Sequence, residues 1–409
     1  MKYILVIGDG MADDPIAALD GKTPLEYATT PAMDKIASQG VFGTVLTVPD
    51  GLPAGSDVAI LSIFGCDPHV CYTGRAPLEA AATGIPLKAG NVAYRCNMVT
   101  LEDGDMPLNE KTLLSHSAGS IEGDISAELV MDLFDTPGFK EAALEAGVSV
   151  YPTQSFRHIA VQDKADIEGL VLIAPHDNLG KKAGELLPSG GSNASVLESL
   201  MRKAHEILDK HPINEKRRKD GKLPANGIWF WAEGTVAQLP SFFDNYGKTG
   251  GVVSAVPLCQ GIGTLIGLEK IIVEGATGVL HTNYEGKVEA ALELLKTHDF
   301  AAIHIEAPDE CSHDGDLEGK IQSIEWIDSR ILSPLMERLE EANIEYRLLL
   351  MADHRTLLST RGHDGAPVPY GIYDSRSDMQ TGLKYCETDA KLGNHISIGT
   401  DIMSQLFES

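Results

Sequence analysis

The 409-residue sequence predicts an α/β protein with a doubly wound, mostly parallel sheet and a smaller inserted α+β domain. Two observations predict the main sheet: short apolar runs that end in glycine or polar residues, and amphipathic helical patterns between successive runs. A third observation predicts the insertion, because residues 90–189 change to short strand-like pieces around one helical pattern. In open sheets of this kind, ligands bind beyond the carboxyl ends of the strands.

The individual elements follow from the pattern of apolar residues. Strands are expected at 2–7, 43–48, 227–232, 251–256, 300–306 and 345–352. Helices are expected at 31–39, 123–135, 195–209, 259–268, 284–298 and 322–342. The first strand stops at Gly8-Asp9-Gly10 and the first helix stops at Gly40, as glycine commonly ends such elements.

The change in the predicted secondary-structure pattern along the chain sets the expected domain boundaries. We expect residues 1–89 and 190–409 to form one discontinuous metal-binding core domain. Residues 90–189 would form an inserted domain that caps the main sheet and contacts the substrate. The Ser-Gly-Gly-Ser stretch at 189–192 is interpreted as the hinge by which the chain returns to the core.

Composition narrows the class of protein and its partners. Acidic residues outnumber basic ones by 59 to 33, which gives a formal net charge of −26 at pH 7. Such a charge repels nucleic acid and anionic membranes, so we expect neither as a partner; a small phosphorylated substrate would need local cations. No window reaches the roughly 18 apolar residues of a membrane span, and the six cysteines form no C-x-x-C pair. We therefore expect a cytoplasmic protein with free thiols, and the sequence leaves its oligomeric state open.

Three short segments near the C-terminus carry the most reactive side chains. They contain Asp309 and His313, then Asp353 and His354, then His363. Each segment lies at or just after the end of an expected strand, so these side chains are predicted to meet at one edge of the sheet. Carboxylates and imidazoles without thiolates suit two divalent ions, with Mn²⁺ and Zn²⁺ foremost and Co²⁺ or Mg²⁺ as alternatives. Paired metal ions suit phosphoryl transfer.

Two residues of the N-terminal part each allow two interpretations. Asp9, between two glycines after a strand, is either a turn residue or a metal ligand on a loop that permits close approach. Ser56 follows a turn rich in Pro and Gly and opens the apolar run VAILSIFG. It can be a helix N-cap, and it can be a nucleophile at a helix N-terminus, where backbone N–H groups favour a phosphate; the two roles do not exclude each other. A metal bound to the serine oxygen would lower its pKa and activate it.

Taken together, these segments resemble the alkaline phosphatase superfamily and, within it, the archaeal-type cofactor-independent phosphoglycerate mutases. The resemblance extends from end to end and is carried by VIGDGMAD, PAGSDVAILSIFGCDP, YTGRAPLEAAATGI, KTGGVVSAVPLCQGIG, IEAPDECSHDGD, MADHRT and RGHDGAPVP. It implies an alkaline-phosphatase-like core that uses two divalent metal ions per chain.

The resemblance also implies which residues of the site bind each metal ion and which one takes the phosphoryl group. One metal would be held by Asp309, His313 and His363, and the other by Asp9, Ser56, Asp353 and His354. Ser56 would take the phosphoryl group from a bound phosphoglycerate. The resulting glycerate would reorient under the cap domain and take the phosphoryl group back on its other hydroxyl, which interconverts 2- and 3-phosphoglycerate without bisphosphoglycerate.

Contacts with the substrate are implied at Arg75, Arg157, His158 and Lys248. Arginine suits phosphate and carboxylate because its fork binds either group bidentately. From the residues alone, Arg75 is equally readable as a surface charge and His158 as a core histidine. The chain departs from the bacterial branch of these mutases, since residues 90–190 lack an Asp-Gly-Arg-Asp stretch and contain only two arginines, Arg95 and Arg157.

Other phosphoryl transfers on the same core stay open at this point. A homoserine kinase-like phosphotransferase would move the phosphoryl group between molecules and would need no G-x-x-x-x-G-K-[ST] loop, which the sequence lacks. A metal-dependent phosphatase or a phosphopentomutase would use the same ligands.

Overall fold

The chain folds into two compact units, which are described separately below. The computed structural model describes residues 1–153 and 155–408. The first unit comprises Met1–Tyr72 and the chain from Gln238 onward, and the second unit is Thr73–Ala237. Within the described residues, none of the helices has the length and apolar character needed to span a membrane.

The first unit contains a sheet, which has eight strands among the described residues. In spatial order these are β15 (Asn394–Ile396), β2 (Val41–Val45), β14 (Val368–Asp374), β11 (Tyr346–Met351), β1 (Lys2–Gly8), β10 (Phe300–Ile305), β8 (Gly250–Val253) and β9 (Glu269–Ile271). Neighbouring strands pair in parallel except where β14 lies between β2 and β11, with which it is antiparallel. A separate hairpin pairs β12 (Arg355–Leu357) with β13 (Gly362–Asp364).

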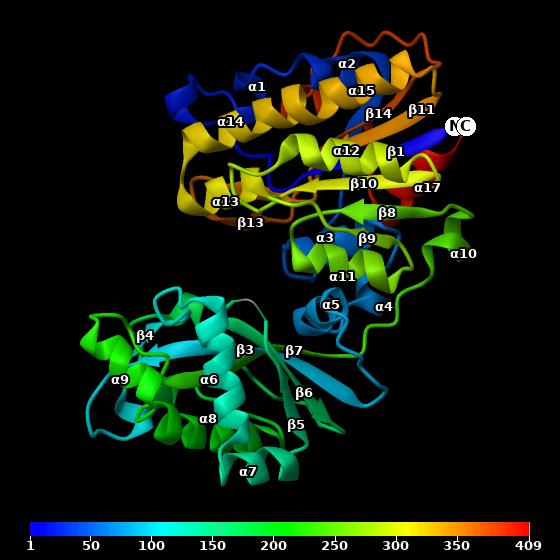
Figure 1. Cartoon of the computed structure of the whole chain (residues 1–409). Coiled ribbons are helices and arrows are strands. Elements are labelled where there is room, and N and C mark those ends of the chain that lie inside the picture. Colours follow the sequence, from blue (N-terminus) through cyan, green and yellow to red (C-terminus); the bar gives the residue numbers. More distant parts are fainter. Residues whose placement is uncertain (154, 409) are drawn as a thin grey trace. The chain divides into compact units, whose positions relative to one another are not determined.

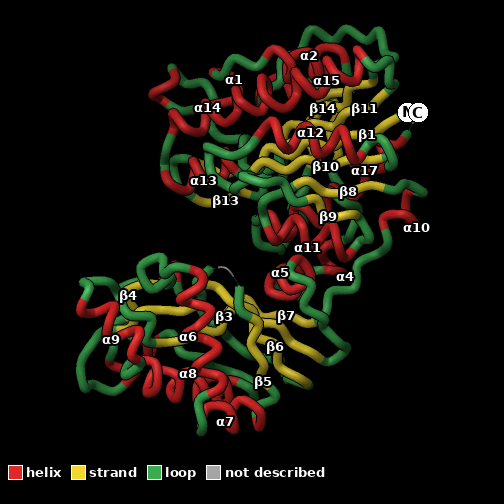
Figure 2. Tube along the Cα trace, in the orientation of Figure 1, coloured by secondary structure: helices red, strands yellow, loops and turns green. Residues whose placement is uncertain are grey.

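Helices connect these strands and pack against them (Figure 1). They are η1 (Ala17–Leu19), α1 (Pro24–Tyr27), α2 (Pro31–Gln39), α3 (Ser56–Ile63), α4 (Pro68–Cys71), α10 (Phe242–Tyr246), α11 (Pro257–Leu265), α12 (Tyr284–Leu294), α13 (Ala307–Asp314), α14 (Leu317–Ile327), η5 (Asp328–Leu332), α15 (Ser333–Glu341), α16 (Glu387–Ala390), η6 (Gly399–Asp401) and α17 (Ile402–Phe407). One group contains α2, α12 and α15, joined by the π-helical turn η5, and a second contains α3 and α11. The alternation of strand and helix along this part of the chain is visible in Figure 2.

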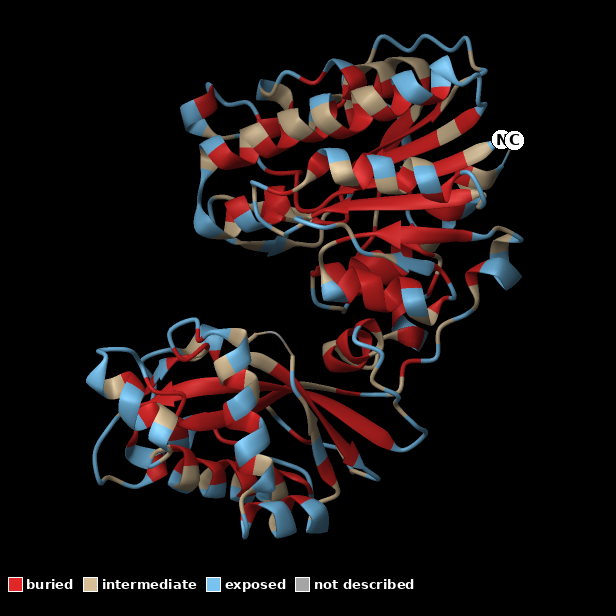
Figure 3. Ribbon diagram, in the orientation of Figure 1, coloured by how far each residue is buried: buried red, intermediate tan, exposed pale blue. Residues whose placement is uncertain are grey.

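The central strands are almost wholly buried, which Figure 3 shows in red. Every residue of β10 is buried, and β1 is buried except at its first residue. Continuous apolar runs such as FAAIHI are typical of parallel strands covered on both faces. Because β11, β1 and β10 are neighbours and parallel, their carboxyl ends lie together at one edge of the sheet.

The second unit has an antiparallel sheet with helices. Its strands are β3 (Asn91–Leu101), β4 (Leu113–Ser115), β5 (Val148–Tyr151), β6 (Arg157–Asp163) and β7 (Gly227–Thr235). Its helices are α5 (Arg75–Ala82), η2 (Leu108–Glu110), α6 (Gly123–Asp135), α7 (Phe139–Glu145), η3 (His176–Asn178), η4 (Ala183–Glu185), α8 (Ala194–Leu208) and α9 (Pro212–Lys219). The long strand β3 lies between β6 and β7 and pairs with both in the antiparallel sense. An apolar core of its own fills this unit, including Trp229, Phe230, Leu129 and Leu197.

The second unit is longer than the expected insertion of 90–189, so those boundaries are corrected to Thr73–Ala237. The reason is strand pairing: β7, expected in the core domain, pairs with β3 from Gly227 to Thr235. The stretch 189–192 is not a hinge between domains. It is a turn inside the second unit, where the Ser189 backbone exchanges hydrogen bonds of 2.8 and 3.1 Å with Val171.

All six cysteines are free and buried. Cys96 lies in β3 of the second unit, and the other five belong to the first unit. Burial raises the pKa of the Cys96 thiol to about 12. At neutral pH this thiol is therefore protonated and inert.

Candidate active site

The predicted C-terminal cluster forms just beyond the end of β10. Asp309 and His313 share one face of α13, and His313 Nε2 lies 3.2 Å from Asp309 Oδ2. His363, on the hairpin strand β13, brings its Nε2 to 2.9 Å from His313 Nε2 and 3.5 Å from Asp309 Oδ1. One carboxylate and two imidazole nitrogens therefore converge within 4.8 Å of one another, as a metal site requires.

The hydrogen bonds behind both rings fix the direction of their lone pairs. His313 Nδ1 donates to the Arg361 carbonyl at 2.9 Å, and His363 Nδ1 donates to the Ala54 carbonyl at 3.2 Å. A ring with its proton on Nδ1 carries its lone pair on Nε2, the atom that faces the cluster. In the metal-free protein a proton takes this place, because the hydrogen bond to Asp309 raises the pKa of His313 to about 9. A bound metal ion would displace that proton and accept both Nε2 lone pairs. Metal-ligating histidines are commonly oriented in this way, by a hydrogen bond from the ring nitrogen that does not face the metal.

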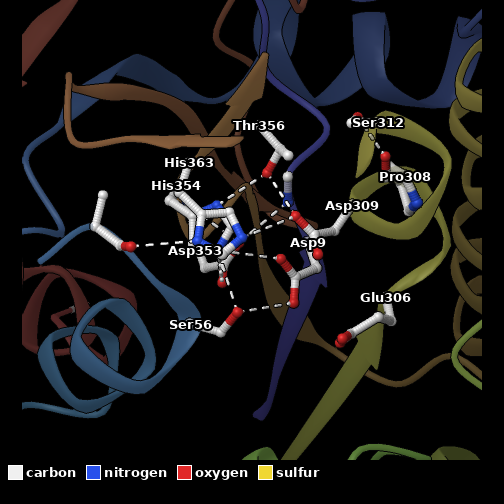
Figure 4. A network of polar contacts seen from close by, with 12 residues as sticks. Asp9, Ser56, Glu306, Pro308, Asp309, Ser312, Asp353, His354, Thr356 and His363 are labelled. Atoms are coloured by element: carbon white, nitrogen blue, oxygen red, sulfur yellow. Dashed lines mark hydrogen bonds and ion pairs between the residues drawn. The ribbon is translucent and has the colours of Figure 1, made fainter. Parts of the chain in front are cut away.

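Four further side chains meet beside this cluster, at the ends of β1 and β11 and the start of α3 (Figure 4). Ser56 Oγ lies 3.1 Å from His354 Nε2 and 3.4 Å from Asp9 Oδ2. His354 Nε2 lies 3.4 Å from Asp353 Oδ2 and 3.5 Å from Asp9 Oδ1. Asp9, Asp353 and His354 are fully buried, so their polar atoms are shielded from bulk water.

The position of Ser56 rules out its role as a helix cap. The N-cap of α3 is Gly55, which offers no side-chain cap, and Ser56 is the first residue inside the helix. The serine oxygen therefore does not cap the helix but faces Asp9 and His354. The N-cap interpretation is wrong because the turn before α3 places glycine, not serine, at the capping position.

Thr356 links the two groups of ligands. Its hydroxyl donates to Asp309 Oδ1 at 2.6 Å and lies 3.2 Å from His354 Nδ1. Since the hydroxyl proton goes to the carboxylate, His354 Nδ1 is the donor to the Thr356 oxygen. His354 therefore also presents an Nε2 lone pair to the site.

The electrostatics of the protein alone are unfavourable here, which shows that the residues fit a cation. Burial, and then the charge of Asp353, raise the pKa of Asp9 well above its usual range. Burial and Asp309 raise the pKa of Glu306 to about 8. Within the described residues, Asp9 Oδ1 and Asp353 Oδ2 are buried without hydrogen-bond partners. Divalent ions would remove the repulsion between these carboxylates and give the orphaned oxygens a partner.

Three residues of the site escaped the sequence analysis, namely His304, Glu306 and Thr356. His304 Nε2 lies 2.9 Å from Asp9 Oδ2, and its Nδ1 lies 3.1 Å from Ser254 Oγ. The signal was present, because IHIE places two ionisable residues at the end of a buried strand, where unpaired charge is rare. Thr356 gave no such signal, as threonine is common in strands.

The structure does not bring Lys248 to this site. Lys248 precedes β8, whose first residue Gly250 pairs with Phe300 at the start of β10. Asp309 follows the other end of β10, about 20 Å away at 3.3 Å per residue. The Lys248 ammonium lies 5.0 Å from the centre of the Tyr3 ring, at the amino ends of the strands.

The remaining residues predicted to contact substrate lie in the second unit. Arg157 and His158 are consecutive in β6 and so point to opposite faces of its sheet. His158 is fully buried, with Nδ1 accepting from the Thr153 amide at 3.1 Å and Nε2 lying 2.9 Å from Ser126 Oγ. Burial lowers the pKa of His158 to about 4, so it is a neutral core histidine. Arg75 is half-buried, with Nε 3.4 Å from Glu79 Oε1.

Comparison with known proteins identifies the family. The family model described as 2,3-bisphosphoglycerate-independent phosphoglycerate mutase matches residues 37–214. A protein of that name from Methanosarcina barkeri (strain Fusaro / DSM 804) is 43% identical over 396 residues, which cover 96% of this chain and 96% of the relative. The chain belongs to this family. A protein from Geobacter sulfurreducens, named as a probable mutase of the same kind, is 43% identical over 394 residues, or 96% of this chain and 95% of the relative.

Solved structures agree with this family assignment. The PH0037 protein from Pyrococcus horikoshii matches with a TM-score of 0.79 at 32% identity and covers 99% of this chain and 97% of its own. The cofactor-independent phosphoglycerate mutase from Thermoplasma acidophilum matches with a TM-score of 0.64 at 25% identity and covers 99% of both chains. The α/β fold and the resemblance to this mutase family are thus confirmed.

Proposed function

We propose that this protein interconverts 2-phosphoglycerate and 3-phosphoglycerate through a phosphoserine at Ser56, without bisphosphoglycerate. The observation that carries the proposal is the position of the Ser56 hydroxyl, 3.1 Å from His354 and 3.4 Å from Asp9, beside a second cluster of carboxylate and imidazole ligands. Relatives with 43% identity over nearly the whole chain bear the name of this activity.

Two divalent ions complete the site in this proposal. Asp309, His313 and His363 would hold one, and Asp9, Ser56, Asp353 and His354 would hold the other. When bound, such a pair supplies positive charge that lowers the pKa of a serine hydroxyl and stabilises the negative charge of the phosphoryl group in the transition state of its transfer. Carboxylate and imidazole donors suit Mn²⁺ and Zn²⁺ first, and Co²⁺ or Mg²⁺ less well.

The chain's own residues do the rest of the work. Ser56 stands at the N-terminus of α3, where the helix dipole and the N–H groups of the first turn favour a phosphoryl group. Its hydroxyl gives up its proton as its oxygen forms a bond to phosphorus, the bond from phosphorus to the C3 oxygen breaks, and the C3 oxygen takes up a proton. The C2 hydroxyl of the retained glycerate then gives up its proton and attacks the phosphoserine, which yields 2-phosphoglycerate and restores Ser56.

Retention of glycerate is what separates a mutase from a phosphatase. If water reached the phosphoserine, the phosphoryl group would be lost as inorganic phosphate. We therefore propose that the second unit acts as the cap that excludes water during this step. A cytoplasmic location, a small phosphorylated substrate and independence from nucleic acid and membranes stay parts of the same proposal.

A coupled assay tests the function directly. Pure 3-phosphoglycerate and enolase, with Mn²⁺ and no bisphosphoglycerate, should give phosphoenolpyruvate, which absorbs in the ultraviolet. Consumption of ATP only in the presence of homoserine would instead show a kinase. Release of inorganic phosphate from many esters, without isomerisation, would show a phosphatase, and either result would overturn the proposal.

A further inference from the structure

Lys320 of α14 lies in the first unit and is completely buried. Its ammonium donates to Asp13 Oδ2 at 2.8 Å and to the Thr356 carbonyl at 2.7 Å. Burial lowers the pKa of Lys320, so enclosing its charge costs free energy, which the charge of Asp13 partly offsets. A buried ion pair often stabilises a fold no more than apolar side chains of similar size. The place of this pair in the fold, rather than its energy, therefore needs an explanation.

The ammonium of Lys320 joins two of the segments that carry the proposed metal ligands. Asp13 lies four residues after Asp9, on the segment that leaves β1. Thr356 lies two residues after His354, on the segment that leaves β11. Each contact of Lys320 therefore lies within four residues of a proposed ligand, and the two contacts follow different strands of the main sheet.

The third of these segments is joined through the helix that carries Lys320. Asp309 and His313 belong to α13, which a connection of two residues joins to α14. Within this connection Asp316 caps α14, since its side chain accepts from the Gly319 amide at 2.9 Å. A connection this short leaves the two helices little freedom to move apart. The bonds of Lys320 therefore also fix the position of α13.

Thr356 carries the effect of this bonding from the backbone to the ligands. Its carbonyl is held by Lys320, and its amide donates to the Ala12 carbonyl at 3.3 Å. A β-branched side chain on a fixed backbone has few rotamers, and the Thr356 hydroxyl donates to Asp309 Oδ1 at 2.6 Å (Figure 4). Thr356 also lies opposite His363 in the hairpin of β12 and β13, where opposite residues share a face. Lys320 therefore supports the backbone behind both groups of ligands.

We propose that Lys320 is a positioning residue that sets the spacing of the two proposed metal-binding groups. It contacts the segments on which their ligands are carried and is not itself a ligand. This inference rests on the proposed function, because the spacing matters where two ions stabilise the attacking and the leaving oxygen of one phosphoryl transfer. Such ions lie roughly 3.5–4 Å apart, so a small shift of one group relative to the other changes the reaction.

A positioning role has consequences that a purely structural role does not have. Without the ammonium, the Thr356 carbonyl loses its anchor, so the ligands must be ordered when an ion binds and the affinity for that ion falls. At saturating metal the altered spacing should still slow the chemical step, which lowers kcat and leaves KM almost unchanged. A site that is correctly built in a less stable protein would instead show a normal kcat per folded molecule.

Removal of both charges of the pair tests this role with little damage to the fold. Lys320→Met alone leaves the buried Asp13 carboxylate without its partner, whereas Lys320→Met combined with Asp13→Asn leaves two uncharged side chains of similar size. Asparagine also keeps an oxygen that can accept from the Leu358 amide, as Asp13 does at 3.2 Å. The double substitution leaves the net charge of the pair at zero, so a change in the electric field cannot account for a change in metal affinity.

Two measurements on the full chain carrying both substitutions give the result. In calorimetric titration of the metal-free protein, Mn²⁺ should bind ~10–100-fold more weakly than to the unmodified chain. In the enolase-coupled assay at saturating Mn²⁺, kcat per folded molecule should fall by about tenfold or more, and KM for 3-phosphoglycerate should stay within about twofold.

Lys111→Met is the matched control. Lys111 is a buried lysine of the second unit that donates to the carbonyls of Glu102 and Gly104 at 2.9 and 2.6 Å. Its replacement should lower the melting temperature and leave both the Mn²⁺ affinity and kcat per folded molecule unchanged.

Three results would overturn the proposal. The first is unchanged Mn²⁺ affinity and kcat in the folded double variant, and the second is a loss of the same size in Lys111→Met. The third is failure of the double variant to fold, which would assign the ion pair to stability alone. Because Mn²⁺ binding is measured without turnover, failure of the proposed function shows separately, as absence of isomerisation by the unmodified chain.

Discussion

Replacing His304 by alanine should weaken metal binding although His304 is not among the proposed ligands. His304 lies between Asp9 and Ser254, at 2.9 Å and 3.1 Å. Ser254 Oγ accepts from the Val256 amide at 3.0 Å, and when His304 Nε2 donates to the ionised Asp9 carboxylate, Ser254 donates its own proton to His304 Nδ1. Burial lowers the pKa of His304 to about 4, so the neutral ring carries its one proton on Nε2 and donates it to Asp9. This bond sets the direction of the Asp9 carboxylate.

The size of the effect follows from the chemistry of the bond. A hydrogen bond to a charged group contributes about 1.5–3 kcal/mol, and at 1.4 kcal/mol per factor of ten this corresponds to a ~10–100-fold loss of Mn²⁺ affinity. His304 is 1% exposed, so alanine also leaves a cavity and lowers stability. His304→Gln should recover most of the affinity, because its amide can donate to Asp9 from a similar position.

Calorimetric titration of metal-free protein with Mn²⁺, together with kcat and KM in the enolase-coupled assay, would measure both effects. His205→Ala is the control, since His205 is a buried histidine of the second unit whose Nδ1 donates to the Asn226 carbonyl at 2.7 Å. It should lower stability and leave metal affinity unchanged. Wild-type Mn²⁺ affinity in folded His304→Ala would refute the argument, as would equal losses in both variants.

Three further predictions concern the nucleophile, the metals and the second unit. Ser56→Ala should abolish isomerisation while the melting temperature stays within a few degrees, and turnover by this variant would remove Ser56 from the mechanism. Removal of metal with EDTA should abolish activity and added Mn²⁺ should restore it; full activity of protein shown by elemental analysis to be metal-free would exclude the metal mechanism. Glu79→Gln should lower the free energy of unfolding at pH 7 by about 3 kcal/mol in urea titrations, because Arg95 lowers the pKa of Glu79 from 4.5 to about 2. That difference is fully present above pH 4.5 and should shrink as the pH falls towards 2; a difference that does not change with pH would exclude the ion pair as its cause.

Local pattern sufficed for the elements that set the site's position. The sequence predicted β1, β10 and β11 to within about two residues, and parallel strands bring their carboxyl ends together by geometry. The apolar pattern alone therefore placed three aspartates at one edge of the sheet, namely Asp9, Asp309 and Asp353. The first and the last of them are over 340 residues apart in the sequence. Their roles as metal ligands stay a proposal.

Pairing partners and side-chain directions were beyond the sequence. The strand at Gly227–Thr235 has the same apolar pattern whether it joins the main sheet or pairs with β3, so the domain boundary was misplaced. His158 and Arg157 are neighbours in sequence, and only the register of β6 shows which one faces the core. Lys248 looked like a substrate contact because its segment matched the family, yet it precedes its strand and so lies at the wrong edge of the sheet.

The distribution of the cysteines allows thiol labelling to report the unfolding of each unit separately. The second unit contains a single sulfhydryl, Cys96, fully enclosed in its central strand, whereas the other five belong to the first unit. An alkylating reagent can reach Cys96 only when β3 opens. The rate at which Cys96 is labelled therefore measures how fast the second unit opens. Mass spectrometry of the labelled peptides would thus follow the two halves of one unmodified chain independently, with no dye or engineered probe.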